Sequence, residues 1–267
     1  MKLVKVEKNR VYTPVIRYRR NDQTVTVIGT LHLGSRDYYQ SLQQEINRHP
    51  EGFFEGGIKP STPGVQIPPE KEVYIGIRQV LADNHRALAR YLGLETQRSM
   101  LTYGDLWQNP DITLDEFLTA APHKVLRRLL KLKDSIEILE DVHRNHPEEL
   151  ARYIKGIHLF QYKFPFAMNI LFSRFGVMDR GVILDLRNSR LFGAVGQNLD
   201  DEGIMDLGIA YGSAHLDGID RYLMRHEFKR EGDFWVLGWE MTENQSFWKS
   251  SSIVVNSIRE SARKKKI

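Results

Sequence analysis

The pattern Gly-x-x-His occurs twice in the chain, and each copy ends a segment that is predicted to be a β-strand. Gly29 and His32 follow the apolar run 25–28, and Gly212 and His215 follow the run 207–211. In an α/β sheet, strand ends on one edge can lie together in space even when they are far apart in the sequence. The two copies therefore predict one sheet with strands from both ends of the chain and both histidines at a shared crevice.

Alternating and apolar runs predict strands at both ends of the chain and helices between them. The predicted strands are 10–20, 24–29, 52–56, 207–211 and 234–239, and helices 37–48 and 218–226 lie among them. In the middle, helices are predicted at 72–92, 133–146, 148–175 and 177–195, with a kink at Pro165. We expect an α/β fold with a central, mostly parallel sheet, crossover helices and a large helical insertion that forms a cap.

The expected organisation has four parts. Residues 1–71 form the first half of the α/β core, 72–176 the helical insertion, 177–250 the second half of the core, and 251–267 a basic C-terminal tail. The segment 57–70 is rich in proline and glycine and is predicted to be a long loop. Because long loops in compact domains are often functional, we expect this loop and the insertion to form the substrate wall.

The composition excludes several kinds of site. The chain has 267 residues and no cysteine, so it has no disulfide, thiolate metal site or cysteine nucleophile, and a metal would need His, Asp, Glu or water as ligands. The N-terminus lacks the apolar core of a signal peptide, and the most apolar stretch, 164–172, is too short to span a membrane. We expect a cytoplasmic protein.

The positive charge is concentrated in clusters. The net charge is +4, and basic residues gather at 17–20, 124–133 and 263–266. These clusters are compatible with a nucleic-acid surface, but basic and aromatic residues do not alternate as they do in RNA-binding motifs. Solvated helix faces and a frayed terminus are the favoured interpretation, so no nucleic-acid partner is expected.

Three residues form the predicted site. Glu55 ends a strand 23 residues beyond His32, and His215 ends a later strand. Two imidazoles and a carboxylate can hold a divalent cation that activates water. Without a metal, His32 can act as a general base toward water with Glu55 as its electrostatic support. Arg187 is expected to bind a substrate carbonyl oxygen or carboxylate, helped by Arg36.

Each of these residues also has a purely structural interpretation. A single Gly-x-x-His is a weak signal, and it is the two copies with a carboxylate on a further strand that make a site credible. Glu55 alone can be a helix cap or a surface residue, and Arg187 alone an ordinary helix-surface cation. Five other histidines fall in the helical middle without ligand spacing, namely His85, His123, His143, His146 and His158.

Four segments, in order, resemble the TraB/PrgY/TIKI/GumN superfamily, which is related to the erythromycin-esterase and ChaN-like folds. They are 25–32, a strand followed by Gly-Thr-x-His; 53–56, a strand with Glu55; 184–194, a helix with Arg187; and 209–223, a strand with the second Gly-x-x-His and a helix. The segment 109–116 is similar to a helix start in the middle of these proteins, and its Thr113 and Glu116 predict a capping box.

The resemblance implies a sheet core with a helical insertion and a polar site of two histidines, a glutamate and an arginine. TIKI members are understood as metal-dependent proteases, erythromycin esterases use a similar His and Glu set, and other relatives bind peptide pheromones or haem. We therefore expect a hydrolase of an amide or ester bond in a peptide or small molecule, with a divalent metal (Mn, Co or Zn) at His32, Glu55 and His215. The alternative is a non-catalytic protein that binds a peptide or haem in the same pocket.

Overall fold

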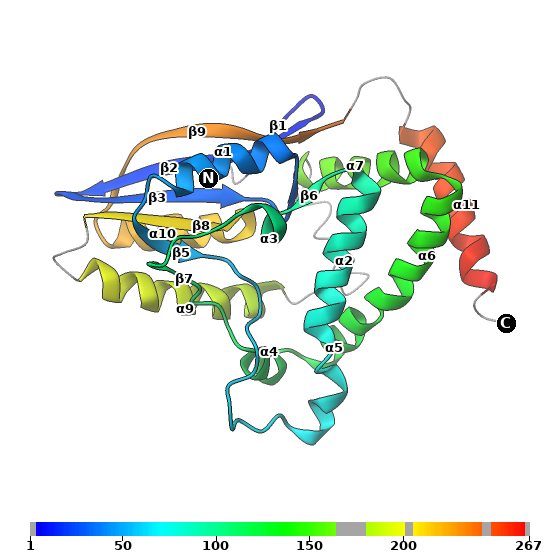
Figure 1. The fold of residues 1–267 in the computed structure, drawn as a ribbon, viewed down its shortest axis with the longest axis horizontal. Coiled ribbons are helices and arrows are strands. Elements are labelled where there is room, and N and C mark those ends of the chain that lie inside the picture. The colour runs from blue at the N-terminus through cyan, green and yellow to red at the C-terminus, as the bar shows by residue number, and fades with distance from the viewer. Residues whose placement is uncertain (1–3, 164–179, 201–204, 242–246, 265–267) are drawn as a thin grey trace.

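A computed structural model describes residues 4–163, 180–200, 205–241 and 247–264. Within these residues, a seven-stranded sheet forms the core (Figure 1), and two short strands form a second sheet. The strands of the large sheet are β1 (Lys5–Glu7), β2 (Arg10–Arg20), β3 (Gln23–Thr30), β5 (Glu51–Phe54), β7 (Trp107–Gln108), β8 (Asp206–Gly212) and β9 (Lys229–Glu240). The small sheet pairs β4 (Leu33–Gly34) with β6 (Glu95–Thr96).

The large sheet has a parallel side and an antiparallel side. β3, β8, β5 and β7 lie side by side in that order and are parallel, whereas β2 pairs antiparallel with β1, β3 and β9. Gly29 of β3 lies opposite Tyr211 of β8, so both Gly-x-x-His copies reach the same edge. The predicted fold class is confirmed. The strands that precede His32 and Glu55, β3 and β5, are not neighbours, because β8 lies between them.

Helices cover both faces of the parallel strands. On one face, α9 (Arg180–Leu199), the short 3-10 turn η2 (Ser213–His215) and α10 (Leu216–Arg225) pack on strand residues such as Val27 and Ile209. On the other face, α1 (Arg36–Ile46) and α3 (Gln97–Met100) flank residues such as Ile28 and Ala210. Because successive strand residues point to opposite faces, the continuous apolar runs of β3 and β8 supply both halves of the core.

The helical insertion lies beside the sheet in Figure 1. It contains the 3-10 helix η1 (Pro69–Tyr74) and the helices α2 (Ile77–Leu92), α4 (Leu114–Ala120), α5 (His123–Leu130), α6 (Leu132–Asn145) and α7 (Pro147–Lys163). The predicted helix 72–92 is thus broken between η1 and α2, and α2 ends at Gly93, which has a positive φ of 61°. The capping box of Thr113 and Glu116 at the start of α4 is confirmed.

The C-terminal segment differs from the expected basic tail. It forms α11 (Phe247–Lys264), which packs against α6 and α7 with Val254 fully buried and Ser261 hydrogen-bonded to Asp141. The apolar spacing of this helix matches a groove between helices, which is why it does not fray. The predicted kink at Pro165 and the apolar stretch 164–172 lie outside the described residues. Among the described helices, none has the length and apolar character needed to cross a membrane.

Candidate functional site

Polar side chains from four neighbouring strands meet at the carboxyl edge of the parallel sheet. His32 follows β3, His215 follows β8, Glu55 follows β5, and Asp111 lies in the loop after β7. Arg187 reaches the same place from α9, which crosses one face of the sheet. Open α/β sheets bind their ligands in the crevice outside the carboxyl ends of the strands, which is where these side chains lie.

Glu55 is the centre of the cluster. Its buried carboxylate accepts an ion-paired contact at Oε1 from Arg187 Nη2 at 2.7 Å and a hydrogen bond at Oε2 from the Gly212 backbone N–H at 2.6 Å. Burial alone would raise the pKa of the Glu55 carboxyl, but Arg187, His215 and His32 outweigh it and hold the pKa well below the ordinary 4.5. Glu55 is therefore an ionised carboxylate at neutral pH.

Gly212 has to be glycine for this carboxylate to fit. A Cβ at this position would lie 2.5 Å from Glu55 Oε2, which is closer than any van der Waals contact. The glycine of the second Gly-x-x-His thus lets the strand backbone approach the carboxylate and donate its N–H. The close approach of Gly212 to Glu55 explains why the second Gly-x-x-His pattern has a glycine, without any requirement from the turn.

Arg187 is held by a second carboxylate. Its Nε and Nη2 donate to the two oxygens of Asp111 at 2.8 and 2.5 Å, a two-point contact that fixes the plane of the guanidinium. Burial alone would lower the pKa of the Arg187 guanidinium, but Asp111 and Glu55 raise it, so the cation is permanent. Because the Asp111 side chain is fully buried, the Asp111–Arg187–Glu55 chain forms a rigid wall of the site.

His215 is buried and fixed by Asn188. Its Nδ1 lies 2.7 Å from Asn188 Oδ1, and its Nε2 lies 3.6 Å from Glu55 Oε1. An amide oxygen can only accept, so this contact places a proton on Nδ1 and turns Nε2 toward Glu55. Gly218 in α10 makes room for Asn188, since a Cβ there would lie 2.6 Å from the amide nitrogen.

His32 is the accessible member of the cluster. Its side chain is 52% exposed, whereas those of Glu55 and His215 are each 3% exposed, and its Nε2 lies 4.0 Å from Glu55 Oε1. The backbone at His32 is tied to the insertion, because the Gln97 N–H donates to the His32 carbonyl at 3.0 Å and β4 pairs with β6. The sheet therefore supplies the carboxylate, and the insertion fixes the histidine that solvent reaches.

The sequence alone did not reveal His85, which lies beside His32. The two rings have centroids 5.1 Å apart, with His85 on α2 of the insertion. Burial, together with the neighbouring His32, lowers the pKa of His85 to about 4, so His85 is neutral at pH 7. It therefore forms an uncharged wall next to the exposed imidazole.

Three buried polar atoms near the cluster lack a hydrogen-bond partner among the described residues. They are Gln97 Nε2, Tyr103 Oη and Tyr211 Oη. Burial raises the pKa of Tyr103 to about 12, to which the charge of Glu55 also contributes, and burial likewise raises the pKa of Tyr211. Unpaired buried donors are costly, so groups of this kind mark places where water or a bound molecule completes the bonding.

Arg36 and Arg190 pair with carboxylates outside the cluster. The Arg36 side chain is 68% exposed and its Nη2 lies 3.3 Å from Glu95 Oε1, so Arg36 pairs with the insertion and not with Glu55. Arg190 pairs with Glu116. The expectation that Arg36 assists Arg187 within the site is therefore corrected, because β4 and the N-cap Ser35, and not a helical turn, separate His32 from Arg36.

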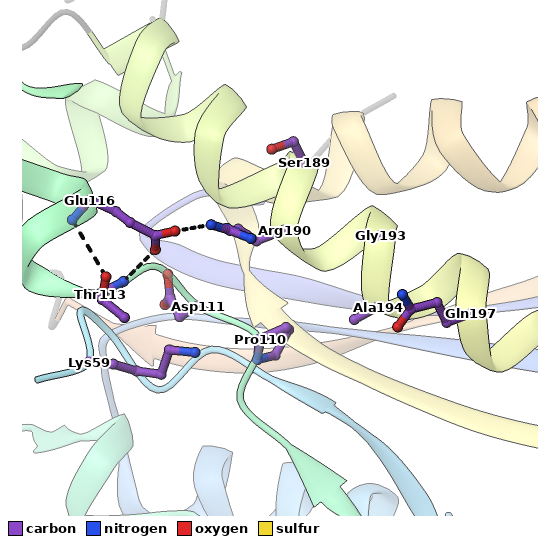
Figure 2. A pocket seen from close by; sticks show the side chains of 10 residues that line it. All are labelled: Lys59, Pro110, Asp111, Thr113, Glu116, Ser189, Arg190, Gly193, Ala194 and Gln197. Atoms are coloured by element: carbon purple, nitrogen blue, oxygen red, sulfur yellow. Dashed lines mark hydrogen bonds and ion pairs between the residues drawn. The ribbon is translucent and has the colours of Figure 1, made fainter. Parts of the chain in front are cut away.

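An open cleft of about 460 Å³ lies next to Asp111, between α9 and the loop that follows β7 (Figure 2). Its lining is mostly polar and includes Lys59, Glu116, Ser189, Arg190 and Gln197. Figure 2 shows Arg190 turned toward Glu116, which leaves Lys59 as the lining cation without an ion pair to a described residue. The cleft meets the cluster at Asp111, and His32, Glu55, Arg187 and His215 are not among its lining residues.

The donor set suits a divalent metal, but its arrangement does not. Two imidazoles and a carboxylate are common ligands. Both oxygens of Glu55 are already engaged by Arg187 and Gly212, and the guanidinium lies where a second cation would have to approach. Within the described residues, no group of three or more His, Asp or Glu side chains is placed to hold a metal ion. A metal here stays a prediction, and it would require the Arg187–Glu55 pair to open.

Comparison with known proteins adds no evidence for or against the family that the sequence resembles. No protein-family model, curated protein or solved structure matches this chain. The likeness to the TraB/PrgY/TIKI/GumN superfamily therefore stays a prediction that rests on the four segments described above.

Proposed function

We propose that this protein hydrolyses an ester or amide bond, with His32 as the base that activates water. The supporting observation is the contrast within one cluster, in which an exposed imidazole lies beside a buried carboxylate that is kept ionised by Arg187. A general base must reach its proton, and His32 is the member of the cluster that solvent and substrate can reach. The resemblance to esterase and protease relatives supports the same reaction class.

The proposed steps use only groups of this chain. His32 takes a proton from a water molecule, whose oxygen then attacks the carbonyl carbon of the substrate. The carboxylate of Glu55, 4.0 Å from Nε2, stabilises the imidazolium that forms. When the tetrahedral intermediate collapses, the imidazolium returns the proton to the leaving oxygen or nitrogen, and the carbon–leaving-group bond breaks.

Arg187 has two roles in this proposal. Its Nε and Nη2 hold Asp111 and Glu55, which positions the carboxylate. Its Nη1 has no hydrogen-bond partner among the described residues and can donate to the oxygen of the substrate carbonyl or to a substrate carboxylate. The fixed guanidinium thereby supplies a positive charge where negative charge develops in the transition state.

The substrate class follows from the walls. The cleft beside Asp111 has a polar lining with Lys59 at its edge, and His85 and Gln97 lie on the insertion side of His32. Polar lining residues of this kind favour a polar substrate over an apolar one. We therefore propose a peptide or another polar amide or ester, and no step is assigned to a metal.

The test is a turnover assay on a panel of short peptides and activated esters, using chelator-treated wild type and Glu55→Gln. The wild type is expected to retain turnover after chelation, and Glu55→Gln to lose about 10²-fold or more, as expected for general-base catalysis without its supporting charge. Turnover that disappears with chelator and returns with Mn, Co or Zn would instead support the metal-dependent form predicted from the sequence.

The matched control is Glu45→Gln, which removes a buried carboxylate at the opposite edge of the sheet. It is expected to turn over substrate like the wild type. If no member of the panel is cleaved while a peptide or haem binds with saturation, the protein is the non-catalytic binder and the hydrolase proposal is wrong.

A further inference from the structure

A patch of unpaired positive charge lies on α5, far along the chain from the site residues. Lys124, Arg127, Arg128 and Lys131 recur at the spacing of one helix face and line a small groove of about 240 Å³. No Asp or Glu occurs between 117 and 133. We call Lys124, Arg127 and Arg128 of α5, with Lys131 at its C-cap, the α5 basic face.

The cations of this face are neighbours on one helix, and carboxylates of the described residues do not neutralise them. None of its four cations is in an ion pair with a described residue. By contrast, Arg10, Arg90 and Arg221 are exposed arginines that pair with carboxylates. The opposite face of α5 is buried through Val125 and Leu126, and Leu126 belongs to a core cluster, so the helix is fixed with its cations toward solvent.

Aliphatic side chains lie exposed on the adjoining segment. Val73 is 68% exposed and Ile75 is 49% exposed, at the end of η1, which contacts α5 through Tyr74 and His123. Figure 1 places η1 and α5 together at the bottom of the view, away from the sheet. This end of the molecule therefore carries charge and apolar surface side by side.

We propose that the α5 basic face, with Val73 and Ile75, docks this protein onto an anionic lipid surface. Unpaired cations are attracted to acidic headgroups, and exposed aliphatic side chains enter the boundary between headgroups and acyl chains. A nucleic acid would use the charge but not the aliphatic residues, and the described part of this surface has no exposed Phe, Tyr or Trp for stacking bases. The combination favours lipid.

The test is sedimentation of the full chain with vesicles of phosphatidylcholine, with or without about one third phosphatidylserine. Binding is expected only with phosphatidylserine. Since each cation contributes about fivefold to such binding, K124Q/R127Q is expected to weaken it at least about tenfold. V73S/I75S is expected to weaken it severalfold, and E70Q/E72Q, which removes the acids of η1, to strengthen it.

The matched control is R225Q/K229Q, which removes two exposed cations from α10 and β9. Its vesicle binding is expected to stay within about twofold of wild type, because those cations lie on other elements. Thermal melting checks that every variant is folded. Equal losses in K124Q/R127Q and R225Q/K229Q would overturn the proposal, as would full binding by V73S/I75S or tighter binding to single-stranded RNA than to the vesicles. Failure here leaves the hydrolase proposal untouched, because α5 is not part of that site.

Discussion

Both edges of the parallel strands hold a buried histidine beside carboxylates, but only at the carboxyl edge does a second, exposed histidine lie beside the same carboxylate. At the amino ends of β5 and β8, His49 lies between Asp206 at 3.0 Å and Glu45 at 3.8 Å, and its side chain is 4% exposed. At the carboxyl ends, Glu55 lies between Arg187, the buried His215 and the half-exposed His32. The same residue types thus leave the histidine buried at one edge and add an accessible histidine at the other.

The difference lies in what neutralises the carboxylate. Glu45 pairs with Arg48, whose side chain is 64% exposed, so water screens much of that pair. Glu55 pairs with Arg187, whose side chain is 16% exposed and is itself fixed by Asp111. A buried charge held on rigid partners keeps its field directed at His32, whereas the histidine beside Glu45 and Asp206 is the buried His49. We infer that the amino edge supports the fold and the carboxyl edge supports chemistry.

The largest expected effect separates the two histidines. His32→Gln should reduce turnover of a confirmed substrate by about 10²- to 10⁴-fold and leave the melting temperature nearly unchanged, because the side chain is half exposed. His49→Gln should do the reverse, costing about 1–3 kcal/mol of unfolding free energy through unpaired buried groups while turnover persists. Initial rates and thermal melting of both variants measure this. Parallel losses of turnover in the two would remove the distinction between the edges.

The second comparison concerns the aspartates. Asp111→Ala leaves the buried Arg187 with one carboxylate in place of two, so we expect a loss of about 3 kcal/mol or more of unfolding free energy. Asp206→Ala removes a carboxylate whose side chain is 41% exposed, and we expect less than about 1 kcal/mol. Urea unfolding of the two variants measures both losses of unfolding free energy. A larger loss for Asp206→Ala than for Asp111→Ala would contradict the role of Asp111 in fixing Arg187.

The third prediction uses the low pKa of Glu55. Since its native pKa is below that of the unfolded chain, near 4.5, the unfolded state binds the extra proton and the ionised carboxylate contributes stability above that pH. This contribution disappears as the pH falls through the native pKa. The stability difference between wild type and Glu55→Gln should therefore shrink below about pH 4.5, as measured by urea unfolding. A difference that is constant from neutral to acidic pH would show that Glu55 is not held ionised.

A smaller effect is expected at the glycine that lets the backbone reach Glu55. Gly212→Ala places a methyl group 2.5 Å from Oε2, which has to move the carboxylate or the strand, and we expect a loss of about 1–3 kcal/mol. Gly193→Ala is the control, because a Cβ there meets no atom within 4 Å. Thermal melting of the two variants should differ clearly, and equal melting would mean that the close approach of Gly212 is not required.

The smallest effect should come from the residue that fixes His215. Asn188→Ala removes one hydrogen bond to Nδ1, for which we expect about a fivefold loss in kcat, equivalent to about 1 kcal/mol. Asn188→Asp, which keeps an acceptor at the same place, should lose less. Steady-state kinetics of both variants tests this, and wild-type turnover in Asn188→Ala would show that the orientation of His215 is set by packing alone.

Much of the sheet could be predicted, because its signals are local. Apolar runs located β3 and β8, and the glycines and histidines after them indicated a shared edge. The carboxylate at the end of β5 followed from the same argument, even though β8 and not β3 proved to be its neighbour. β7 escaped prediction because two residues, Trp107 and Gln108, carry no periodicity.

The rest of the site depends on contacts between distant segments. Asp111 was recognised only as part of a helix start, and nothing in its spacing shows that it faces Arg187, 76 residues later. His85 was set aside because its helix has no ligand spacing, yet tertiary packing brings it to His32. Asn188 directly follows Arg187, which is a candidate site residue. Its place next to Arg187 in the sequence is the signal that could have identified it.

The most direct measurement of the central claim is chemical rescue of His32→Ala. The substitution removes the imidazole without disturbing the buried Glu55–Arg187–Asp111 chain, and the half-exposed position leaves room for a free imidazole to enter. We predict that turnover of the chelator-treated variant is lost and that added imidazole restores part of it in a saturable way. Full turnover by the variant without imidazole would contradict the assignment of His32 as the base.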